Sequence, residues 1–264
     1  MIPRHKFLFI LPLIISTVLG SGCVSNLPSS SVQAPARLNE WTQIADGVEE
    51  LDATAISVSS THLVLYAFDP TKYSFQFAYA TSGKSVVDWH SAHPEAMAVF
   101  NGTFFNPDYS PSGEVLHRGV ALGKQQFDLD KTAFLEFVPE IRIVDTAHET
   151  FQVTSSSEAA QSYPILVKEG MATIKPGSTQ YARRTFAAVR ADQHVILGVV
   201  ADGALTLHQL SYELAQPKFQ ITQALNLDGG PSTGMSIHAL DHNKRINSLL
   251  PVSISILVIP LRGN

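Results

Sequence analysis

Two polar side chains and a pair of glycines follow an apolar run near the C-terminus, in Asn226-Leu227-Asp228-Gly229-Gly230. Alternate residues of a strand share a face, so Asn226 and Asp228 would project together while Leu227 points into a core. Gly229 and Gly230 allow positive φ angles or a close approach of the backbone to a ligand. A carboxylate presented in this way can serve as a nucleophile, a general base or an electrostatic stabiliser. The alternative is a polar turn in which Asp228 accepts hydrogen bonds from local backbone donors.

A similar turn lies earlier in the chain, where an apolar run ending at Phe100 is followed by Asn101-Gly102-Thr103. The carboxamide of Asn101 can donate to and accept from a sugar hydroxyl or a phosphate oxygen. Taken alone, Asn-Gly is a turn signal. The two turns can contribute to one site only if the fold brings them to a common cavity.

Arginines form a third element, Arg183-Arg184-Thr185, just before an expected strand. Guanidinium groups match a phosphate in charge and in bidentate hydrogen-bond geometry, so this pair could hold an anion. A solvated surface pair is the alternative, because arginine is so often exposed. His117-Arg118 is a weaker candidate of the same kind.

The elements expected to position these residues are mainly short strands. Tyr73, Phe75 and Phe77 alternate with small or polar residues, as in a half-buried strand. One helix has clear start signals, because Thr206 and Gln209 form a Thr-x-x-Gln capping box. The fold class expected is α+β, a single domain with a mixed, largely antiparallel sheet core and a few flanking helices. The strands expected are Leu63–Phe68, Tyr73–Tyr79, Phe134–Val138, Ile141–Asp145, Thr185–Arg190, Val195–Ala201 and Val252–Ile259.

The N-terminus has the order of a secretory signal. Arg4 and Lys6 precede an apolar run that ends at Leu19, and Gly20-Ser21-Gly22 leads to Cys23, the single cysteine of the chain. Cys23 is therefore expected to be lipidated, as in bacterial lipoproteins; the alternative is an ordinary signal peptide with an incidental cysteine. The sequence divides into a signal peptide (1–22), the lipidated cysteine with a flexible tether (23–40) and a folded domain (41–264).

Together these segments resemble the phosphodiester glycosidase family. The resemblance depends on the order of several blocks and extends from about Val64 to Ile259. There are two departures: Pro231 stands where the family often has a third glycine, and Ala187-Ala188 where it frequently has a small residue followed by glycine. The blocks are Asn101 to Phe105, Tyr163 to Gly170, Arg184-Thr185 and Asn226 to Thr233.

The resemblance implies cleavage between an anomeric carbon and the oxygen of a phosphodiester. A phosphate leaving group needs less general-acid help and more anion stabilisation than that of an ordinary glycosidase. Asp228, Arg184 and Asn101 are expected to be catalytic, with Arg184 stabilising the anion and Asp228 facing the oxocarbenium centre. No cofactor or metal ligand is assigned, although scattered aspartates could bind a divalent cation through oxygen. The residues expected to bind substrate are Gly102, Thr103, His117, Arg118, Asn226, Gly229, Gly230, Ser232 and Thr233.

The expected function is that of an exported hydrolase acting on a sugar-1-phosphodiester in an envelope or extracellular glycan. Two alternatives are a non-catalytic lipoprotein that binds anionic phosphoglycan and an envelope assembly factor with a vestigial pocket. The formal net charge of −5 argues against a nucleic-acid partner, which requires a basic surface. Val24 beside the acylated cysteine resembles the pattern sent to the outer membrane, so a host with two membranes would hold the protein there, facing the periplasm.

Overall fold

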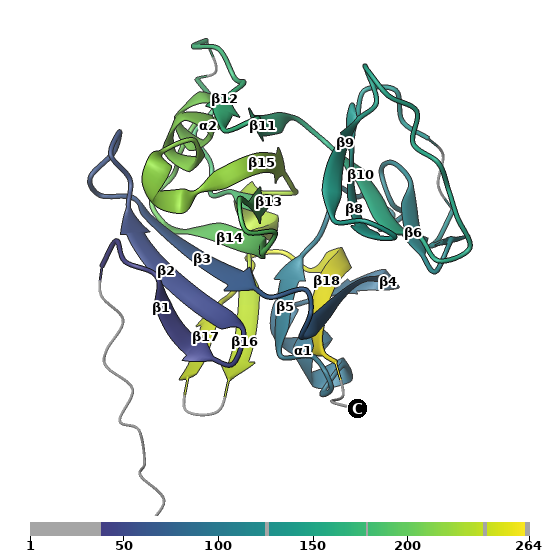
Figure 1. The fold of residues 1–264 in the computed structure, drawn as a ribbon. Coiled ribbons are helices and arrows are strands. Elements are labelled where there is room, and N and C mark those ends of the chain that lie inside the picture. Colours follow the sequence, from purple (N-terminus) through teal and green to yellow (C-terminus); the bar gives the residue numbers. More distant parts are fainter. Residues whose placement is uncertain (1–37, 125–126, 178, 240–241, 262–264) are drawn as a thin grey trace, which may run out of the picture. The chain divides into compact units, whose positions relative to one another are not determined.

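Three antiparallel sheets make up the computed structural model, which describes residues 38–124, 127–177, 179–239 and 242–261 (Figure 1). The largest sheet has eight strands, and its central members β13 and β15 supply the two segments that the sequence marks for chemistry. In spatial order its strands are β1 (Thr42–Ala45), β2 (Val48–Thr54), β3 (His62–Phe68), β14 (Val195–Asp202), β13 (Thr185–Arg190), β15 (Ile221–Asn226), β11 (Ile165–Lys168) and β12 (Met171–Ala172).

The other two sheets have five strands each. One contains β5, which ends at Asn101 and lies between β16 and β18. Its order is β17 (His242–Ile246), β16 (Met235–Ala239), β5 (Ala98–Asn101), β18 (Val252–Pro260) and β4 (Tyr73–Lys84). The order of the third sheet is β7 (Val120–Ala121), β6 (Val115–His117), β10 (Glu158–Ser162), β8 (Ala133–Val138) and β9 (Arg142–Asp145).

The inner faces of the three sheets share one apolar core. Strand β3 shows how the eight-stranded sheet is buried on both sides: Val64, Tyr66 and Phe68 point into this core, whereas Leu63 and Leu65 point into a second cluster on the other face. Alternate side chains of a strand face opposite ways, so a strand apolar at every position fits a sheet covered on both faces. The loops at the strand ends are thereby fixed to a rigid framework.

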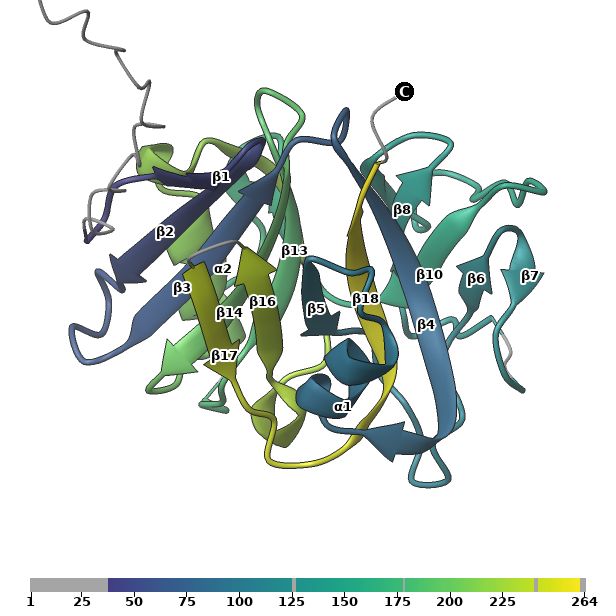
Figure 2. The same ribbon diagram turned by 90° about the horizontal axis from the view of Figure 1, so that it is seen from below.

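Two α-helices cover outer faces in the described part of the chain. Helix α2 (Leu207–Leu214) begins with the expected capping box at Thr206 and packs Leu210 and Leu214 on the outer face of the eight-stranded sheet. Helix α1 (Val86–Ala92) is capped by Ser85 and lies against the sheet that contains β5, as Figure 2 shows. Its Trp89 belongs to a buried cluster with Val99 and Leu257 of that sheet. Two 3₁₀ turns complete the elements: η1 (Pro217–Phe219) and η2 (Gly230–Ser232).

The expected fold class is only partly right. The antiparallel sheet core and the few flanking helices are confirmed, but the protein is more β-rich than a balanced α+β fold, because strands also form where the sequence lacks strand preference. Examples are β10 (Glu-Ala-Ala-Gln-Ser) and β17 (His-Asn-Lys-Arg-Ile), which form by pairing with neighbours already in place. The signal peptide, Cys23 and the tether as far as residue 37 lie outside the described residues.

Candidate functional site

The loop after β15 is clamped between the start of β13 and the end of β5. The backbone N–H of Leu227 donates to the carbonyl of Thr185 (2.9 Å), and that of Gly230 donates to the carbonyl of Arg183 (2.8 Å). The N–H of Asp228 donates to the carbonyl of Gly102 (3.2 Å) on the other side. Gly230 has a φ of +58°, a conformation that glycine adopts without strain. Three segments remote in sequence therefore meet at Asp228.

Asn101 is the cross-link among these segments. Its side chain is fully buried, and its Nδ2 donates to the carbonyl of Asp228 (2.7 Å). Its Oδ1 accepts from the hydroxyl of Thr185 (2.7 Å) and from the N–H of Gly234 (3.0 Å). With both acceptor sites and one donor occupied by protein, the carboxamide fits a positioning role better than the substrate contact that the sequence predicts. Thr185 completes this cross-link, a part that sequence reasoning did not assign to it.

Asp228 is partly buried, and its carboxylate is held by two local donors. The N–H of Gly229 donates to Oδ1 (2.9 Å), and the hydroxyl of Ser232 forms a second hydrogen bond. The local turn, which is the alternative role for Asp228, is thus present. Burial nevertheless raises the pKa of Asp228, although the two hydrogen bonds act in the opposite direction. A raised carboxyl pKa in a held geometry is common where carboxylates do chemistry.

Arg184 is a buried cation whose guanidinium donates to backbone carbonyls. Only 8% of the residue is exposed; Nε donates to the carbonyl of Leu205 (3.1 Å) and Nη2 to that of Gln180 (2.9 Å). Burial lowers the pKa of Arg184, and no carboxylate of the described residues forms an ion pair with it. A Cβ at Gly229 would lie 3.7 Å from Cδ of Arg184 and 2.9 Å from the carbonyl oxygen of Arg183. The absence of a side chain at Gly229 therefore lets the Asp228 loop approach the arginines.

Apart from His117, whose Nδ1 lies against Glu158, three of the residues expected to bind substrate have buried polar atoms with no hydrogen-bond partner elsewhere in the described structure. They are Oγ1 of Thr103, Oδ1 of Asn226 and Oγ1 of Thr233. The amide of Asn226 donates to the carbonyl of Tyr163 (3.0 Å), which orients its oxygen. Since leaving a buried polar atom unpaired costs about 1–3 kcal/mol, such atoms fit contacts with a ligand or ordered water.

His117 and Arg118 belong to a different part of the fold, the β6–β7 hairpin. Nδ1 of His117 lies 2.7 Å from Oε1 of Glu158, and the N–H of Arg118 donates to the same oxygen (3.0 Å). Arg118 is exposed and has a φ of +49°. The contacts of this pair run to Glu158 rather than to the Asp228 loop, so the structure does not join them to the other predicted site residues.

An aromatic pair that the sequence did not assign lies beside the site. The rings of Phe104 and Tyr163 are 5.1 Å apart, and Nζ of Lys131 lies over both, 5.6 Å and 5.2 Å from their centroids. Tyr163 is 40% exposed. Its position next to Asn226 depends on the pairing of β11 with β15, which neither local sequence reveals.

Among the described residues we find neither a candidate metal site nor a helix that could span a membrane. No group of three His, Cys, Asp or Glu side chains in those ranges is arranged to hold a metal ion. Nor does any helix there have the length and apolar character needed to cross a membrane.

A family comparison covers the segments that meet at Asp228. Residues 94–259, more than half of the chain, match the model of the phosphodiester glycosidase family. The chain belongs to the phosphodiester glycosidase family. The match includes Asn101, Arg184 and Asp228, and it ends where the resemblance in the sequence ends. A search of the curated proteins finds no match.

Solved structures of other proteins show a similar fold. The catalytic domain of zebrafish N-acetylglucosamine-1-phosphodiester alpha-N-acetylglucosaminidase, auto-inhibited by its pro-peptide, is 13% identical with a TM-score of 0.58. That alignment covers 81% of this chain and 82% of the zebrafish chain. A hypothetical protein from Synechocystis is 15% identical with a TM-score of 0.54, over 82% of this chain and 62% of that one. At these identities the likeness concerns the fold alone.

Proposed function

We propose that this phosphodiester glycosidase hydrolyses the bond between the anomeric carbon and the phosphate oxygen of a sugar-1-phosphodiester. One observation carries the proposal: Gly229 lets the Asp228 loop lie against Arg184. A carboxylate with a raised pKa and a cation whose partners among the described residues are backbone carbonyls therefore adjoin one loop. A sugar-1-phosphodiester offers a partner for each, a developing positive charge at the anomeric carbon and a negative charge on the phosphate.

The roles follow from these contacts. Arg184 neutralises the departing phosphate, and a buried guanidinium does so more strongly than one in water. The Asp228 carboxylate faces the anomeric carbon, which becomes positive in an oxocarbenium-like transition state. Asn101 and Thr185 fix the loop. The hydroxyls of Thr103 and Thr233 can donate to sugar or phosphate oxygens, and Oδ1 of Asn226 can accept from a sugar hydroxyl. The configuration of the released sugar separates a nucleophilic role of Asp228 from activation of water.

Hydrolysis in heavy-oxygen water tests the bond cleaved. Purified protein is incubated with the methyl phosphodiester of α-N-acetylglucosamine-1-phosphate, the class named for the zebrafish structure. We expect the label in the released sugar, since attack occurs at carbon. Label in the methyl phosphate would identify a phosphodiesterase that attacks phosphorus. Binding of a wider set of sugar-1-phosphodiesters with no hydrolysis of any would favour a non-catalytic phosphoglycan-binding protein.

We further propose that this hydrolase lies in the cell envelope, where a lipid on Cys23 anchors it. The support for this location is the order of charge, apolar run, small residues and cysteine in residues 1–23. In a host with two membranes the anchor would lie in the outer membrane, with the enzyme facing the periplasm and its phosphoglycan substrates.

Cys23→Ser tests the anchor. We expect the wild-type chain to incorporate labelled palmitate and to fractionate with membranes, because an acyl chain adds apolar area that partitions into lipid. The variant should lose the label and leave the membrane fraction. A variant that retains both would show that the cysteine is incidental.

A further inference from the structure

A cleft of about 920 Å³ lies beside the loop that follows β5, and residues Asn106 to Gly113 of that loop contribute to its lining. This volume is near the upper end of the range of about 300–1,000 Å³ for small-molecule sites. Asn106 to Gly113 form one wall and Phe127 to Asp130 the other. The residues that line it are Asn106, Asp108, Ser110, Pro111, Ser112, Gly113, Lys124, Phe127, Asp128, Leu129 and Asp130.

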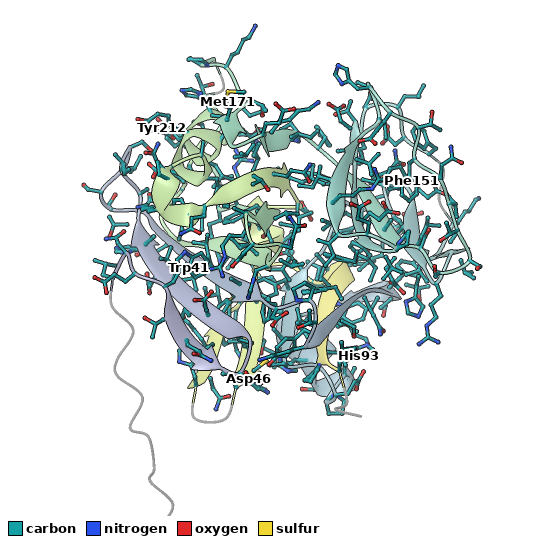
Figure 3. The ribbon with its side chains drawn as sticks, in the orientation of Figure 1. Trp41, Asp46, His93, Phe151, Met171 and Tyr212 are labelled. Carbon is teal, nitrogen blue, oxygen red and sulfur yellow. The ribbon has the colours of Figure 1, made fainter. Side chains whose placement is uncertain are left out.

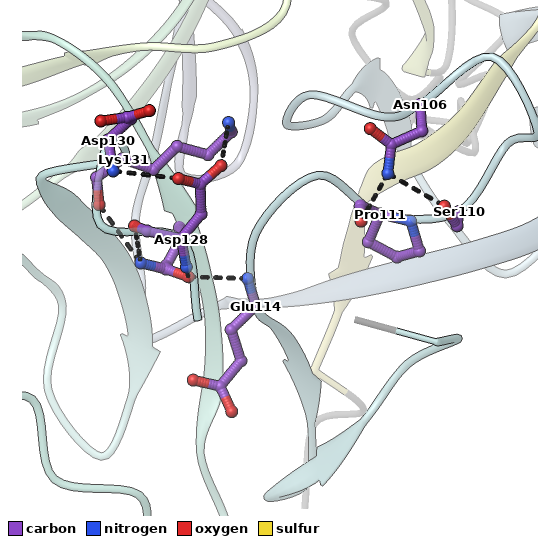
Figure 4. A network of polar contacts seen from close by, with 8 residues as sticks. Asn106, Ser110, Pro111, Glu114, Asp128, Asp130 and Lys131 are labelled. Carbon is purple, nitrogen blue, oxygen red and sulfur yellow. Dashed lines mark hydrogen bonds and ion pairs between the residues drawn. The ribbon is translucent and has the colours of Figure 1, made fainter. Parts of the chain in front are cut away.

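The two walls are fixed to each other by a buried glutamine. Oε1 of Gln161 accepts from the N–H groups of Glu114 (2.8 Å) and Asp128 (3.0 Å). Its Nε2 donates to the carbonyls of Asp128 (3.0 Å) and Lys131 (3.2 Å). All four hydrogen-bonding positions of the amide are used, and Figure 4 shows Glu114 on one side and Asp128 to Lys131 on the other. The cleft is therefore built in advance of any ligand.

The cleft is joined to the Asp228 site through the loop after β5. That loop meets Asp228 at the carbonyl of Gly102 and meets the cleft where the carbonyl of Phe104 accepts from the N–H of Ser112 (2.9 Å). The Phe104 ring belongs to this loop and lies 5.1 Å from the ring of Tyr163, whose backbone carbonyl accepts from Nδ2 of Asn226 (3.0 Å). Arg184 approaches the Asp228 loop from β13 instead.

The cleft differs in charge from the side of the Asp228 loop where Arg184 lies. Asp108, Asp128 and Asp130 line it together with Lys124, and the Nζ of Lys131 already pairs with Asp128 (2.7 Å). The hydroxyl of Ser110 lowers the pKa of Asp108, and Lys131 lowers that of Asp128, so both are ionised at neutral pH. The negative charge of these carboxylates repels a phosphate. Their oxygens can nevertheless accept hydrogen bonds from sugar hydroxyls.

Phe127 supplies an apolar surface beside these polar groups. It is 49% exposed, and its ring is supported by Phe134, 6.1 Å away between centroids. Asn106 adds a carboxamide on the opposite wall, where Nδ2 donates to Oγ of Ser110 (2.9 Å; Figure 4). A supported aromatic ring among carboxylates and amides suits the apolar face and the hydroxyls of a pyranose.

From this arrangement we infer that the cleft is a subsite for a neutral sugar attached to the one whose anomeric carbon faces Asp228. The phosphate lies on the Arg184 side, and the saccharide extends past Phe104 and Tyr163 to Phe127. The inference rests on the proposed function and adds a substrate class to it, oligosaccharyl-1-phosphodiesters.

Phe127→Ala tests the subsite with two substrates, the methyl phosphodiesters of α-N-acetylglucosamine-1-phosphate and of N,N′-diacetyl-α-chitobiose-1-phosphate. We expect KM for the disaccharide substrate to rise about tenfold, with kcat and the constants for the monosaccharide substrate unchanged. Phe151→Ala is the matched control, because Phe151 (labelled in Figure 3) stacks on Phe134 at 3.9 Å without lining the cleft. Equal effects of Phe127→Ala on both substrates, or none on either, would overturn the inference.

Binding of neutral sugars tests the subsite without turnover. N,N′-diacetylchitobiose, cellobiose and maltose are titrated into the purified full-length protein, and binding is followed by calorimetry. Wild type and Phe151→Ala should bind at least one disaccharide, and Phe127→Ala should bind it about tenfold more weakly, even if no phosphodiester is hydrolysed. Absence of binding to all three, or the same affinity for Phe127→Ala, would refute the subsite and leave hydrolysis to be judged separately.

Discussion

Asp228→Asn is expected to lower kcat for a sugar-1-phosphodiester by at least about a thousandfold while substrate still binds. The substitution removes the negative charge that would face the anomeric carbon. It keeps the side-chain oxygen that accepts from the N–H of Gly229 at 2.9 Å, so the loop should retain its geometry. Steady-state kinetics with the methyl phosphodiester, together with circular dichroism, measure the two properties.

Asp202→Asn is a matched control for this variant. Asp202 also precedes a glycine and accepts from its N–H at 2.9 Å, but it is exposed at the end of β14. Its replacement should leave kcat unchanged. Asp228→Asn with wild-type turnover would remove the carboxylate from the mechanism.

The pH dependence follows from the burial of Asp228, which raises its pKa above the ordinary value of 3.8. As the pH falls through the raised pKa, the carboxylate is protonated, so the acid limb of kcat/KM should lie above pH 3.8. Because the pKa of Asp228 is higher in the folded protein, the folded protein binds the carboxyl proton more tightly than the unfolded chain does. The protonated carboxyl therefore stabilises the fold at low pH, and this stabilisation is lost as the pH rises through the folded pKa. Asp228→Asn should therefore be at least as stable as wild type at neutral pH.

Arg184→Gln is expected to lower kcat/KM by about a hundredfold to a thousandfold, because it removes the cation that neutralises the phosphate. The free energy of unfolding should change by less than about 1 kcal/mol, since the lost hydrogen bonds to Leu205 and Gln180 are offset by relief of a buried charge. Urea denaturation and kinetics on the same preparation would measure both quantities. Loss of activity without loss of stability is typical of a residue retained for function.

Arg190→Gln provides the control from the opposite end of the same strand. Arg190 is as buried as Arg184, but Nη2 contacts Oδ2 of Asp192 at 2.7 Å, so its charge is already matched. Its replacement should leave kcat/KM unchanged. N-acetylglucosamine-1-phosphate should raise the Tm of wild type and Arg190→Gln and not of Arg184→Gln, because only ligand bound to the folded state stabilises it. An equal Tm rise in Arg184→Gln would exclude Arg184 as the anion site.

Local signals in the sequence were sufficient for the elements that rest on local physics. The capping box of Thr206 and Gln209 needs only one helical turn, and the alternation from Tyr73 to Phe77 needs only one strand. The antiparallel hairpin of β13 and β14 was also expected, because a short connection leaves few other pairings. Strands such as β10 and β17 were missed, since pairing with neighbours rather than side-chain preference holds them in place.

By itself the sequence determined the family, the turns that present Asn101 and Asp228, and the position of Arg184 just before a strand, because motif order, strand-ending glycines and strand patterns are properties of the chain. Only the tertiary structure decided how they act together. Asn101 reaches Asp228 across 127 residues of sequence, and its carboxamide is used as a cross-link. The same folding placed His117 and Arg118 with Glu158 on another sheet. Hydrogen bonds between distant segments depend on strand pairing and loop closure, which no local pattern encodes.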